Sequence, residues 1–518
     1  MCLSLNAIGA PIQCLQLGKL MADTALAIGA RDADPGQRLF QQGNAMFQID
    51  RNSKTLLVDQ IRNAIIARIE SFQWVQGGRL PSVRALAKQL GVSIFTVSSA
   101  YEDLVAQHII ESRPGAGYFI LACNSVGPLK DIDTLVPPSS EHSSFLFRAL
   151  DPTQYDIPVS SGYLPPAWLA DAVPASVTGR LIRNTLSCST PAPAAGSQDL
   201  RAVIARKLRE VHINASSSQI VVTMGATHAL SLLRSILLGP GDYLLVEDPS
   251  YLLLQLKLIK ERDFKIITVP RLNDGPDLAA MEAMLIKYRP KLFLTQTQVH
   301  NPTGGSTSPE KGFKLLSLAR QYDFHIIEDD IFGALSSRQT LRLASLDGCE
   351  RTFYISGFSK VLSPALRLGY VAAPLAFVER LVEQKMYSVL SGSAIDETIV
   401  TYTLESGRYQ HHLDVLGQRV MQERSRAREW LGAVGVVFDE HGAEGLFLWG
   451  RLPEHVNIPN LVEQAHHVGI LLAPGSLFSN TSEYERYIRF NVSHCNHPVF
   501  KRFLQAHITS VLSIEHGA

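Results

Sequence analysis

One lysine in the second half of the chain stands where a reactive amine is expected. Lys360 follows the apolar run TFYIS in the segment TFYISGFSK, and Arg367 lies seven residues further on in SPALRLGY. A lysine amine that can lose its proton forms covalent bonds with carbonyl groups, and a nearby arginine can hold an anion. A single lysine in such a place is usually a solvated surface residue, so the residues around it decide between the two interpretations.

Other candidate ligand-binding residues follow several short apolar runs, which are rich in β-branched residues and predict buried strands. They are Gly225, Ala226 and Thr227 after IVVT, Tyr251 after YLLVE, Asn301 after KLFLTQ, and Asp329 and Asp330 at the end of HIIEDD. Amphipathic stretches between these runs predict helices, and the alternation indicates parallel βαβ units. Because open α/β sheets bind ligands beyond the carboxyl ends of their strands, these residues predict one ligand site together with Lys360.

A dense helical pattern precedes this region. Residues 58–72 place apolar side chains at spacings of three and four, which is one face of a helix. Ser82 is a candidate N-cap for a second helix that ends at Gly91, and Ser93 for a third helix that runs to about Gln107. The runs IIES and GYFI then flank RPGAG and predict a two-stranded wing. Two short helices around a glycine-containing turn are a helix-turn-helix pattern, whose second helix can enter the major groove.

The chain has 518 residues, too many for one ordinary domain. Its predicted regions are an N-terminal extension over 1–50, a winged-helix domain over 51–122, a linker rich in Pro and Ser over 123–155, and a large α/β domain over 156–518. Basic and acidic residues number 48 each, a balance that is still compatible with a small DNA-binding module. The six scattered cysteines indicate a reducing cytoplasm without a metal site, and no apolar run is long enough to predict a membrane span.

The helix-turn-helix module resembles the GntR-type winged-helix domain. The resemblance rests on LPSVRALAKQLGVS, on the TV and AYEDL runs and on ESRPGAGYF, which stand in this order. It implies that Arg84 contacts a DNA phosphate, that the start of the third helix approaches the bases, and that residues 113–117 place a wing tip at the minor groove. The residues that it implies for DNA contact are Arg79, Ser82, Arg84, Ser93, Thr96, Arg113, Gly115 and Gly117.

One part of this module departs from the family. Ile94 and Phe95 follow Ser93, where the family often has a basic residue. Apolar side chains cannot form the bidentate hydrogen bonds that identify guanine. They are either packed against the domain or in contact with thymine methyl groups, and the sequence leaves both interpretations open.

The large region resembles the fold-type I pyridoxal-phosphate enzymes of the class I aminotransferase group, because five of their motifs stand in the same order. The resemblance implies that Lys360 forms a Schiff base with pyridoxal 5'-phosphate and that Asp329 pairs with the pyridinium nitrogen. It also implies that Asn301 donates to the ring hydroxyl and that Tyr251 stacks on the ring. Gly225, Ala226, Thr227, Ser359 and Arg367 would hold the phosphate, while Arg489 and Gly162 would meet a substrate carboxylate.

Two departures argue against efficient catalysis. Family members usually carry a tyrosine two or three residues after the cofactor aspartate, but here Ile331 and Phe332 stand near that place. A hydroxyl residue is common three positions before the lysine, where this chain has Gly357. Each missing hydrogen bond to a charged group is worth roughly 1.5–3 kcal/mol, so we expect cofactor binding to survive and turnover to be weak.

A GntR-type domain joined to an aminotransferase-like domain resembles the MocR subfamily of transcription regulators. The resemblance implies a cytoplasmic homodimer that binds promoter DNA and senses pyridoxal phosphate, or an amino or carboxylate compound, in its large domain. The expected fold is therefore a small α+β winged helix-turn-helix plus a large α/β domain of the fold-type I kind. The alternative function is a working aminotransferase with an appended winged-helix domain.

Overall fold

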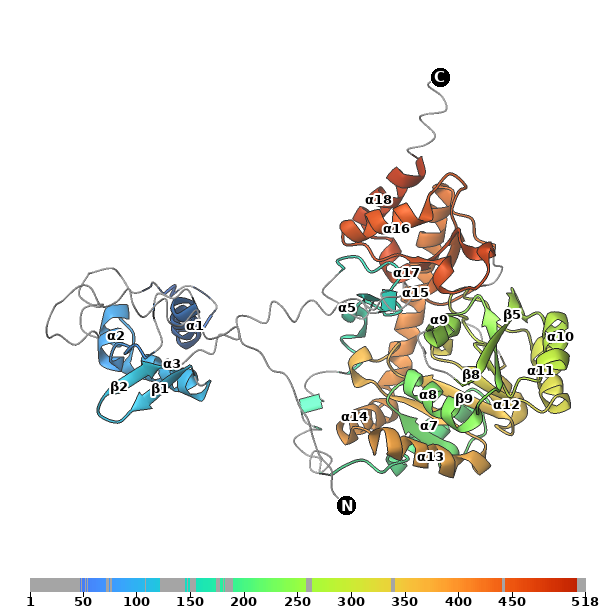
Figure 1. Ribbon diagram of the computed structural model, residues 1–518, viewed down its shortest axis with the longest axis horizontal. Helices are drawn as coiled ribbons and strands as arrows, with labels where there is room; N and C mark the ends of the chain where they lie inside the picture. The colour runs from blue at the N-terminus through green and yellow to red at the C-terminus, as the bar shows by residue number, and fades with distance from the viewer. Residues whose placement is uncertain are drawn as a thin grey trace, which may run out of the picture. The chain divides into compact units, whose positions relative to one another are not determined.

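The computed structural model describes residues 47–121, 145–149 and 155–509, apart from gaps at 48, 52, 54, 71–73, 75–76, 108, 147, 174–177, 180, 182–189, 258–262, 337–340 and 440–442. The predicted extension over 1–50 and the predicted linker over 123–155 lie mostly outside the described residues and stay predictions. The chain forms two compact units, one within residues 1–135 and one within residues 136–518, and each is described by itself (Figure 1).

The smaller unit is the predicted winged helix-turn-helix. Its elements are α1 (Leu57–Glu70), α2 (Val83–Leu90), α3 (Ile94–Ala106), β1 (Ile110–Arg113) and β2 (Gly117–Ile120). Ser82 caps α2, and Gly91, in a left-handed conformation with φ of 65°, ends it. The apolar face of α1 packs on α3 because Ile61 and Ile65 are buried with Val97 and Tyr101 in one cluster. β1 and β2 pair antiparallel and form the wing.

The larger unit is built on an eight-stranded sheet with the order β3-β10-β9-β8-β7-β4-β5-β6. The strands are β3 (Ile220–Thr223), β4 (Tyr243–Asp248), β5 (Lys265–Leu272), β6 (Gly275–Pro276), β7 (Leu292–Thr295), β8 (His325–Asp329), β9 (Thr352–Gly357) and β10 (Gly369–Ala372). The parallel pairing of β4, β5, β7, β8 and β9 agrees with the prediction. The prediction of parallel units missed β10, which runs antiparallel between β3 and β9. Residues 358–368 connect it to β9 and are too few for a parallel crossover, which needs a dozen residues or more.

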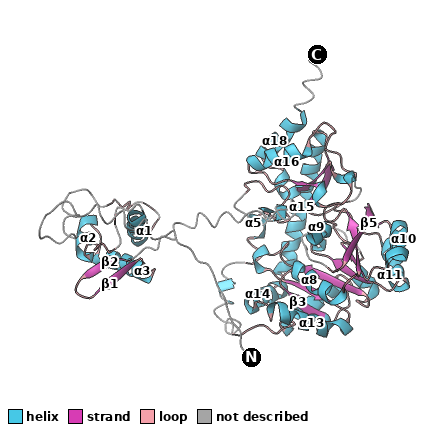
Figure 2. Ribbon diagram, in the orientation of Figure 1, coloured by secondary structure: helices cyan, strands magenta, loops and turns pink. Residues whose placement is uncertain are grey.

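Both faces of this sheet are buried, which explains why its strands are continuous apolar runs. Successive residues alternate between the two layers: Val221 of β3 packs with α8 and α13, whereas Ile220 and Val222 pack with α7. The helices that flank the sheet are α7 (Gln198–Glu210), α8 (Ala226–Leu237), α9 (Tyr251–Lys257), α10 (Leu278–Tyr288), α11 (Pro309–Gln321), α12 (Leu343–Asp347), α13 (Leu375–Val389) and α14 (Ala394–Glu405). Figure 2 shows α8, α9, α10, α11, α13 and α14 in cyan around the magenta strands.

A second, smaller sheet follows in the chain, and the sequence did not predict it. The long helix α15 (Arg408–Ala433) leads to β11 (Phe447–Arg451), β12 (Ala473–Pro474) and β13 (Tyr487–Asn491), which pair antiparallel. The helices around them are α16 (Ile458–His467), α17 (Val492–Cys495) and α18 (Pro498–Thr509), and the short α5 (Pro166–Leu169) lies earlier in the chain. None of the described helices combines the length and the apolar character needed to cross a bilayer.

Candidate functional site

A cavity of about 1400 Å³ lies in the larger unit, at the edge where β3, β4, β7, β8 and β9 end. The start of β10 reaches the same edge because this strand runs antiparallel to its neighbours, and Arg367 precedes that start. The structure therefore brings the residues predicted for the cofactor and effector together. Those that line the cavity are Gly162, Ala226, Thr227, Tyr251, Asn301, Asp329, Ser359, Lys360, Arg367 and Arg489, and Gly225 directly precedes Ala226.

Lys360 follows β9 and projects its amine into this cavity. Its Nζ lies 3.8 Å from the centre of the Tyr163 ring and 5.7 Å from that of Phe332. A Cβ at position 162 would lie 3.4 Å from the same Nζ, so Gly162 brings the backbone close to the amine. Burial, together with the positive charges of Arg489 and Arg367, lowers the pKa of Lys360 to about 7. A large fraction of the amine is therefore neutral and nucleophilic near neutral pH.

Asp329 ends β8 and is buried at the wall of the cavity. Gln296 donates a hydrogen bond from Nε2 to Asp329 Oδ2 at 3.2 Å, while Oδ1 has no partner among the described residues. Burial and the neighbouring carboxylate of Asp330 raise the pKa of Asp329 to about 7. A buried carboxylate oxygen without a donor costs free energy, and a protonated ring nitrogen is a group that satisfies it.

The residues after β3 form an anion cradle. Gly225 has φ of 78° and precedes the first turn of α8, and the start of a helix is a place where backbone N–H groups and the helix dipole favour an anion. The exposed Arg367 guanidinium lies over it, because a Cβ at Gly225 would be 3.2 Å from Arg367 Nη2. The buried Ser359 Oγ has no partner among the described residues. A Cβ at Gly369 would lie 2.8 Å from the Gly225 carbonyl carbon, so only glycine fits at this crossing.

These observations fit pyridoxal phosphate. The cavity offers an amine of lowered pKa, a buried carboxylate that lacks one partner, and a helix start with an arginine for a phosphate. Among the described residues, no three His, Cys, Asp or Glu side chains are grouped in a way that holds a metal ion.

Arg489 lies at the centre of β13 and is buried at the cavity wall. It donates from Nη1 to Asn301 Oδ1 at 2.9 Å and from Nη2 to the Ser160 carbonyl oxygen at 2.5 Å. Its guanidinium carbon also lies 4.5 Å from the centre of the Phe447 ring. Burial lowers the pKa of Arg489 to about 10, and Nε has no partner among the described residues. The side chain is held in one orientation and keeps donors for an anionic ligand.

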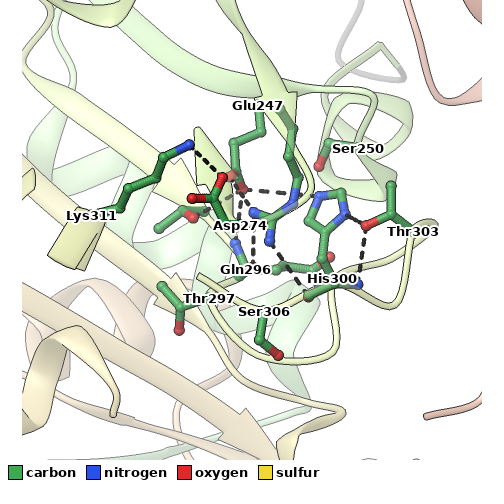
Figure 3. A network of polar contacts seen from close by, with 12 residues as sticks. Glu247, Ser250, Asp274, Gln296, Thr297, His300, Thr303, Ser306 and Lys311 are labelled. Carbon is green, nitrogen blue, oxygen red and sulfur yellow. Dashed lines mark hydrogen bonds and ion pairs between the residues drawn. The ribbon is translucent and has the colours of Figure 1, made fainter. Parts of the chain in front are cut away.

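A buried polar network contacts the residues of the site (Figure 3). Glu247 pairs with Arg271, and it also accepts hydrogen bonds from Thr295 Oγ1 at 2.9 Å and from the Gln296 backbone N–H at 3.2 Å. The Gln296 side chain continues the network, because its Oε1 accepts from the Asn301 backbone N–H at 3.1 Å while its Nε2 donates to Asp329. The network therefore fixes Asn301 and Asp329, two of the residues that the resemblance assigns to the cofactor ring.

Sequence reasoning missed Gln296 and Tyr163. Both touch their partners across long sequence separations, Gln296 to Asp329 and Tyr163 to Lys360, so no local pattern marks them. It also missed Phe145 and Leu146, which fall within the predicted linker and line the same cavity. Phe145 is buried against the small sheet of the larger unit.

The two departures from the aminotransferase pattern both lie at the cavity wall. The Phe332 ring packs edge-on against Phe447 with 5.2 Å between ring centres, so an apolar edge stands where the family has a hydroxyl. A Cβ at Gly357 would lie 3.1 Å from the Leu368 carbonyl oxygen and 3.2 Å from Gly369 Cα. Glycine at this position is explained by the close pairing of β9 with β10.

In the smaller unit, the hydroxyl groups predicted for DNA contact also serve as helix caps. Ser82 Oγ accepts from the Ala85 N–H at 3.2 Å, and Ser93 Oγ accepts from the Thr96 N–H at 3.0 Å. The hydroxyls of Ser93 and Thr96 lie 2.7 Å apart and bond to each other. Their capacity for additional bonds to DNA is therefore small.

The predicted basic contacts are exposed. Arg84 lies at the first turn of α2, and no described residue accepts a hydrogen bond from it. Arg113 pairs with Glu111 at 2.5 Å and lies over the Phe119 ring at 4.4 Å. Arg79 lies beside the wing, where a Cβ at Gly117 would be 3.3 Å from its Nε. Gly115, with φ of 74°, forms the exposed wing turn.

The packed interpretation of Ile94 and Phe95 is wrong. Their side chains are 56% and 80% exposed, because the buried face of α3 is formed by Val97, Tyr101 and Leu104. The apolar pair points away from the domain core.

Comparison with known proteins agrees with this architecture. Residues 57–120 match the family described as bacterial regulatory proteins, gntR family, and residues 167–506 match aminotransferase class I and II. The HTH-type transcriptional regulator YdcR of Escherichia coli K12 is 30% identical over 456 residues, covering 84% of this chain and 94% of its own. TauR of Rhodobacter capsulatus, also an HTH-type transcriptional regulator, is 28% identical over 454 residues, covering 83% of this chain and 91% of its own. Kynurenine aminotransferase of Pyrococcus horikoshii, solved with PMP, superimposes with a TM-score of 0.65 at 22% identity over 74% of this chain and 99% of its own.

The fold and the site define a DNA-binding regulator whose second domain has the fold-type I aminotransferase architecture. The chain belongs to the GntR-family transcription regulators of the MocR type, since its relatives share both domains over nearly their whole length.

Proposed function

We propose that this regulator binds pyridoxal 5'-phosphate covalently at Lys360 and changes its hold on promoter DNA when the cofactor or an amino compound occupies the cavity. The observation that carries the proposal is that Lys360, whose pKa is lowered, and Asp329 line the same cavity. One oxygen of the buried Asp329 carboxylate, Oδ1, has no hydrogen-bond partner among the described residues. The same chain carries a winged helix.

Bound pyridoxal phosphate supplies an aldehyde that condenses reversibly with amines. The chain's own residues would prepare the site for it. Lys360 would provide the neutral amine, Asp329 would pair with the ring nitrogen, and Asn301 would donate to the ring hydroxyl. Tyr251, whose N–H donates to the Asn301 carbonyl oxygen at 2.9 Å, supports the ring face. Gly225, Ala226 and Thr227, with Ser359 and Arg367, would hold the phosphate.

The effector class follows from Arg489. An amino compound with a carboxylate would place its amine at Lys360 and its carboxylate at Arg489, with Gly162 leaving room between them. Phe145 and Leu146 line the same cavity, and they stand where the predicted linker from the winged helix meets the larger unit. A ligand that contacts this segment can change DNA binding if it has different affinities for two conformations of the regulator.

We further propose that the chain acts as a cytoplasmic homodimer. Exposed apolar side chains gather at the end of α13, where Met386, Tyr387 and Leu390 offer a surface for a second copy. The alternative function, a working aminotransferase, is disfavoured by the apolar edge of Phe332 beside Lys360.

The test of the proposal has two readouts on the purified full chain. Addition of pyridoxal phosphate to the apo-protein should produce an absorbance band near visible wavelengths. Affinity for the DNA upstream of its own gene should then differ between the apo-protein, the loaded protein, and the loaded protein with individual amino acids. The proposal is contradicted if the chain stays colourless. It is also contradicted if the affinity for every upstream fragment is the same with and without these additions.

Arg84→Ala should weaken binding to all promoter fragments and make the binding less sensitive to salt. Each lost phosphate contact lowers the slope of log K against log salt concentration by about 0.9. Fluorescence anisotropy at several salt concentrations measures the slope. Lys314→Ala removes the same charge from an exposed position on α11 of the larger unit and serves as the matched control. Equal slopes for the two variants would rule out a phosphate contact at Arg84.

Arg489→Lys should weaken the response to amino acids about tenfold to a hundredfold, the effect of losing one hydrogen bond to a charged group. The response to amines that have the same side chain but no carboxylate should change much less. The concentration of each compound that half-displaces the absorbance band measures the effect. An equal loss for both sets of compounds would show that Arg489 does not hold the carboxylate.

A further inference from the structure

Helix α3 lacks the side chains that usually identify purines in the major groove. Its sequence, IFTVSSAYEDLVA, contains no Arg, Lys, Asn or Gln. Guanine is read by bidentate contacts from Arg or Lys, and adenine by contacts from Asn or Gln. If α3 distinguishes base pairs, it must do so with other groups.

The polar groups of α3 offer little in exchange. Ser93 and Thr96 bond to each other at 2.7 Å, which leaves one hydroxyl proton for an outside acceptor. Further along, Ser98 donates to Glu102 Oε1 at 3.0 Å. The Glu102 carboxylate is repelled by phosphates, so the first turn is the part of the helix suited to close approach.

That first turn presents an apolar surface. Phe95 is 80% exposed, more than any other large apolar side chain among the described residues, and Ile94 beside it is 56% exposed. Because the two side chains are neighbours, they form a contiguous apolar patch, and such patches mark interaction sites.

Exposed positive charges in the same unit indicate a polyanionic partner. The exposed cations on α2 and at the wing are Arg79, Arg84, Lys88 and Arg113. Exposed cations in the same small unit as an exposed apolar helix start suit a groove in which methyl groups lie between two rows of phosphates.

We infer that Ile94 and Phe95 recognise the 5-methyl groups of thymines in the major groove. The preferred half-site then contains thymines opposite the first turn of α3, and T·A pairs at these positions are favoured over C·G pairs because of the methyl group. This inference rests on the proposed DNA-binding function and names the chemistry by which the regulator selects its operator.

The test uses thymine and deoxyuridine, which differ only by that methyl group. The full chain, incubated with pyridoxal phosphate, first selects its preferred duplexes from a random pool. Deoxyuridine then replaces thymine at one position at a time. Burial of one methyl-sized group predicts about a fourfold loss of affinity at each contacted position. Replacements elsewhere in the duplex should have no effect.

Two variants assign the effect to the side chains. Phe95→Ala and Ile94→Ala should bind the thymine and deoxyuridine duplexes with equal affinity at the position that each residue contacts. Because both side chains are exposed, the thermal unfolding of the variants should match that of the parent chain. Phe313→Ala, which removes another exposed phenylalanine from α11 of the larger unit, should leave the fourfold difference intact. Arg84→Ala should weaken both duplexes by the same factor.

The outcomes separate this inference from the function on which it rests. If no duplex is selected over random DNA, the proposed DNA reading fails and the inference fails with it. If duplexes are selected but deoxyuridine is tolerated everywhere within a factor of two, the regulator stands and the methyl contact is overturned. A deoxyuridine penalty that survives in both apolar variants also overturns it, because other residues then read the methyl groups.

Discussion

Lys360→Ala is expected to abolish covalent attachment of pyridoxal phosphate to the chain. With a pKa of about 7, most of the Lys360 amine is neutral at pH 7.5, whereas an ordinary lysine of pKa 10.5 is neutral in about one molecule in a thousand. Borohydride reduction after incubation with the cofactor, followed by peptide mass analysis, should label one lysine in the parent chain and none in the variant.

Lys385 is the internal control in the same experiment. Burial lowers the pKa of this lysine too, but it donates to the Ala194 carbonyl oxygen at 2.5 Å and does not line the cavity. Borohydride reduction should leave Lys385 unlabelled in both the parent chain and the Lys360→Ala variant. Cofactor trapped at Lys385, or at any lysine other than Lys360, would refute the assignment.

The pH dependence of the attachment rate follows from the lowered pKa. Below pH 7 the Lys360 amine is mostly protonated, so the rate should rise with pH and level off above about pH 7. An ordinary lysine would give a rate that continues to rise towards pH 10. Stopped-flow absorbance of the apo-protein between pH 6 and pH 9 distinguishes the two profiles.

The sequence predicted the parts of the fold in which burial leaves a local pattern. A strand covered on both faces, such as residues 292–295 with the sequence LFLT, is an apolar run, and the polar residues that follow it mark the edge where ligands bind. The helix caps Ser82 and Ser93 were also visible, since a capping side chain lies next to the helix that it caps.

The remaining features depend on residues far apart in the chain. Nothing near Gln296 indicates that its amide will meet Asp329, and nothing near Tyr163 indicates that its ring will lie below Lys360. The antiparallel direction of β10 depends on a short connection, which apolar patterning does not record. Ile94 and Phe95 were ambiguous because composition does not distinguish a buried apolar side chain from one held outward by a rigid helix start.

The buried ion pair between Glu247 and Arg271 belongs to the network that positions the site residues. Both side chains are almost fully buried, at 0% and 1% exposure, and Glu247 also accepts from Thr295 and the Gln296 backbone. Nearby His300 is buried, and burial together with the positive charge of Arg271 lowers its pKa well below the usual value. His300 is therefore neutral, so Arg271 is the cation that balances Glu247.

Glu247→Leu should lower the free energy of unfolding of the larger unit by about 3–5 kcal/mol, because it leaves the buried Arg271 charge without a partner. The double variant Glu247→Leu with Arg271→Met should recover much of this loss, since it removes both charges. Recovery should remain incomplete, because Thr295 and the Gln296 N–H lose their acceptor in both variants. Urea unfolding of the apo-protein, followed by near-ultraviolet circular dichroism, measures these differences.

A control variant tests the effect of the buried ion pair on stability, and cofactor affinity tests its effect on the position of Asp329. Lys314→Ala breaks the exposed pair with Glu310 and should change stability far less than Glu247→Leu. Since Glu247 orients Gln296, and Gln296 holds Asp329, the double variant should also bind pyridoxal phosphate more weakly even where its stability has recovered. If the double variant is no more stable than Glu247→Leu, the unpaired charge is not the cause of the loss. If its cofactor affinity equals that of the parent chain, the buried pair stabilises the fold without positioning the site.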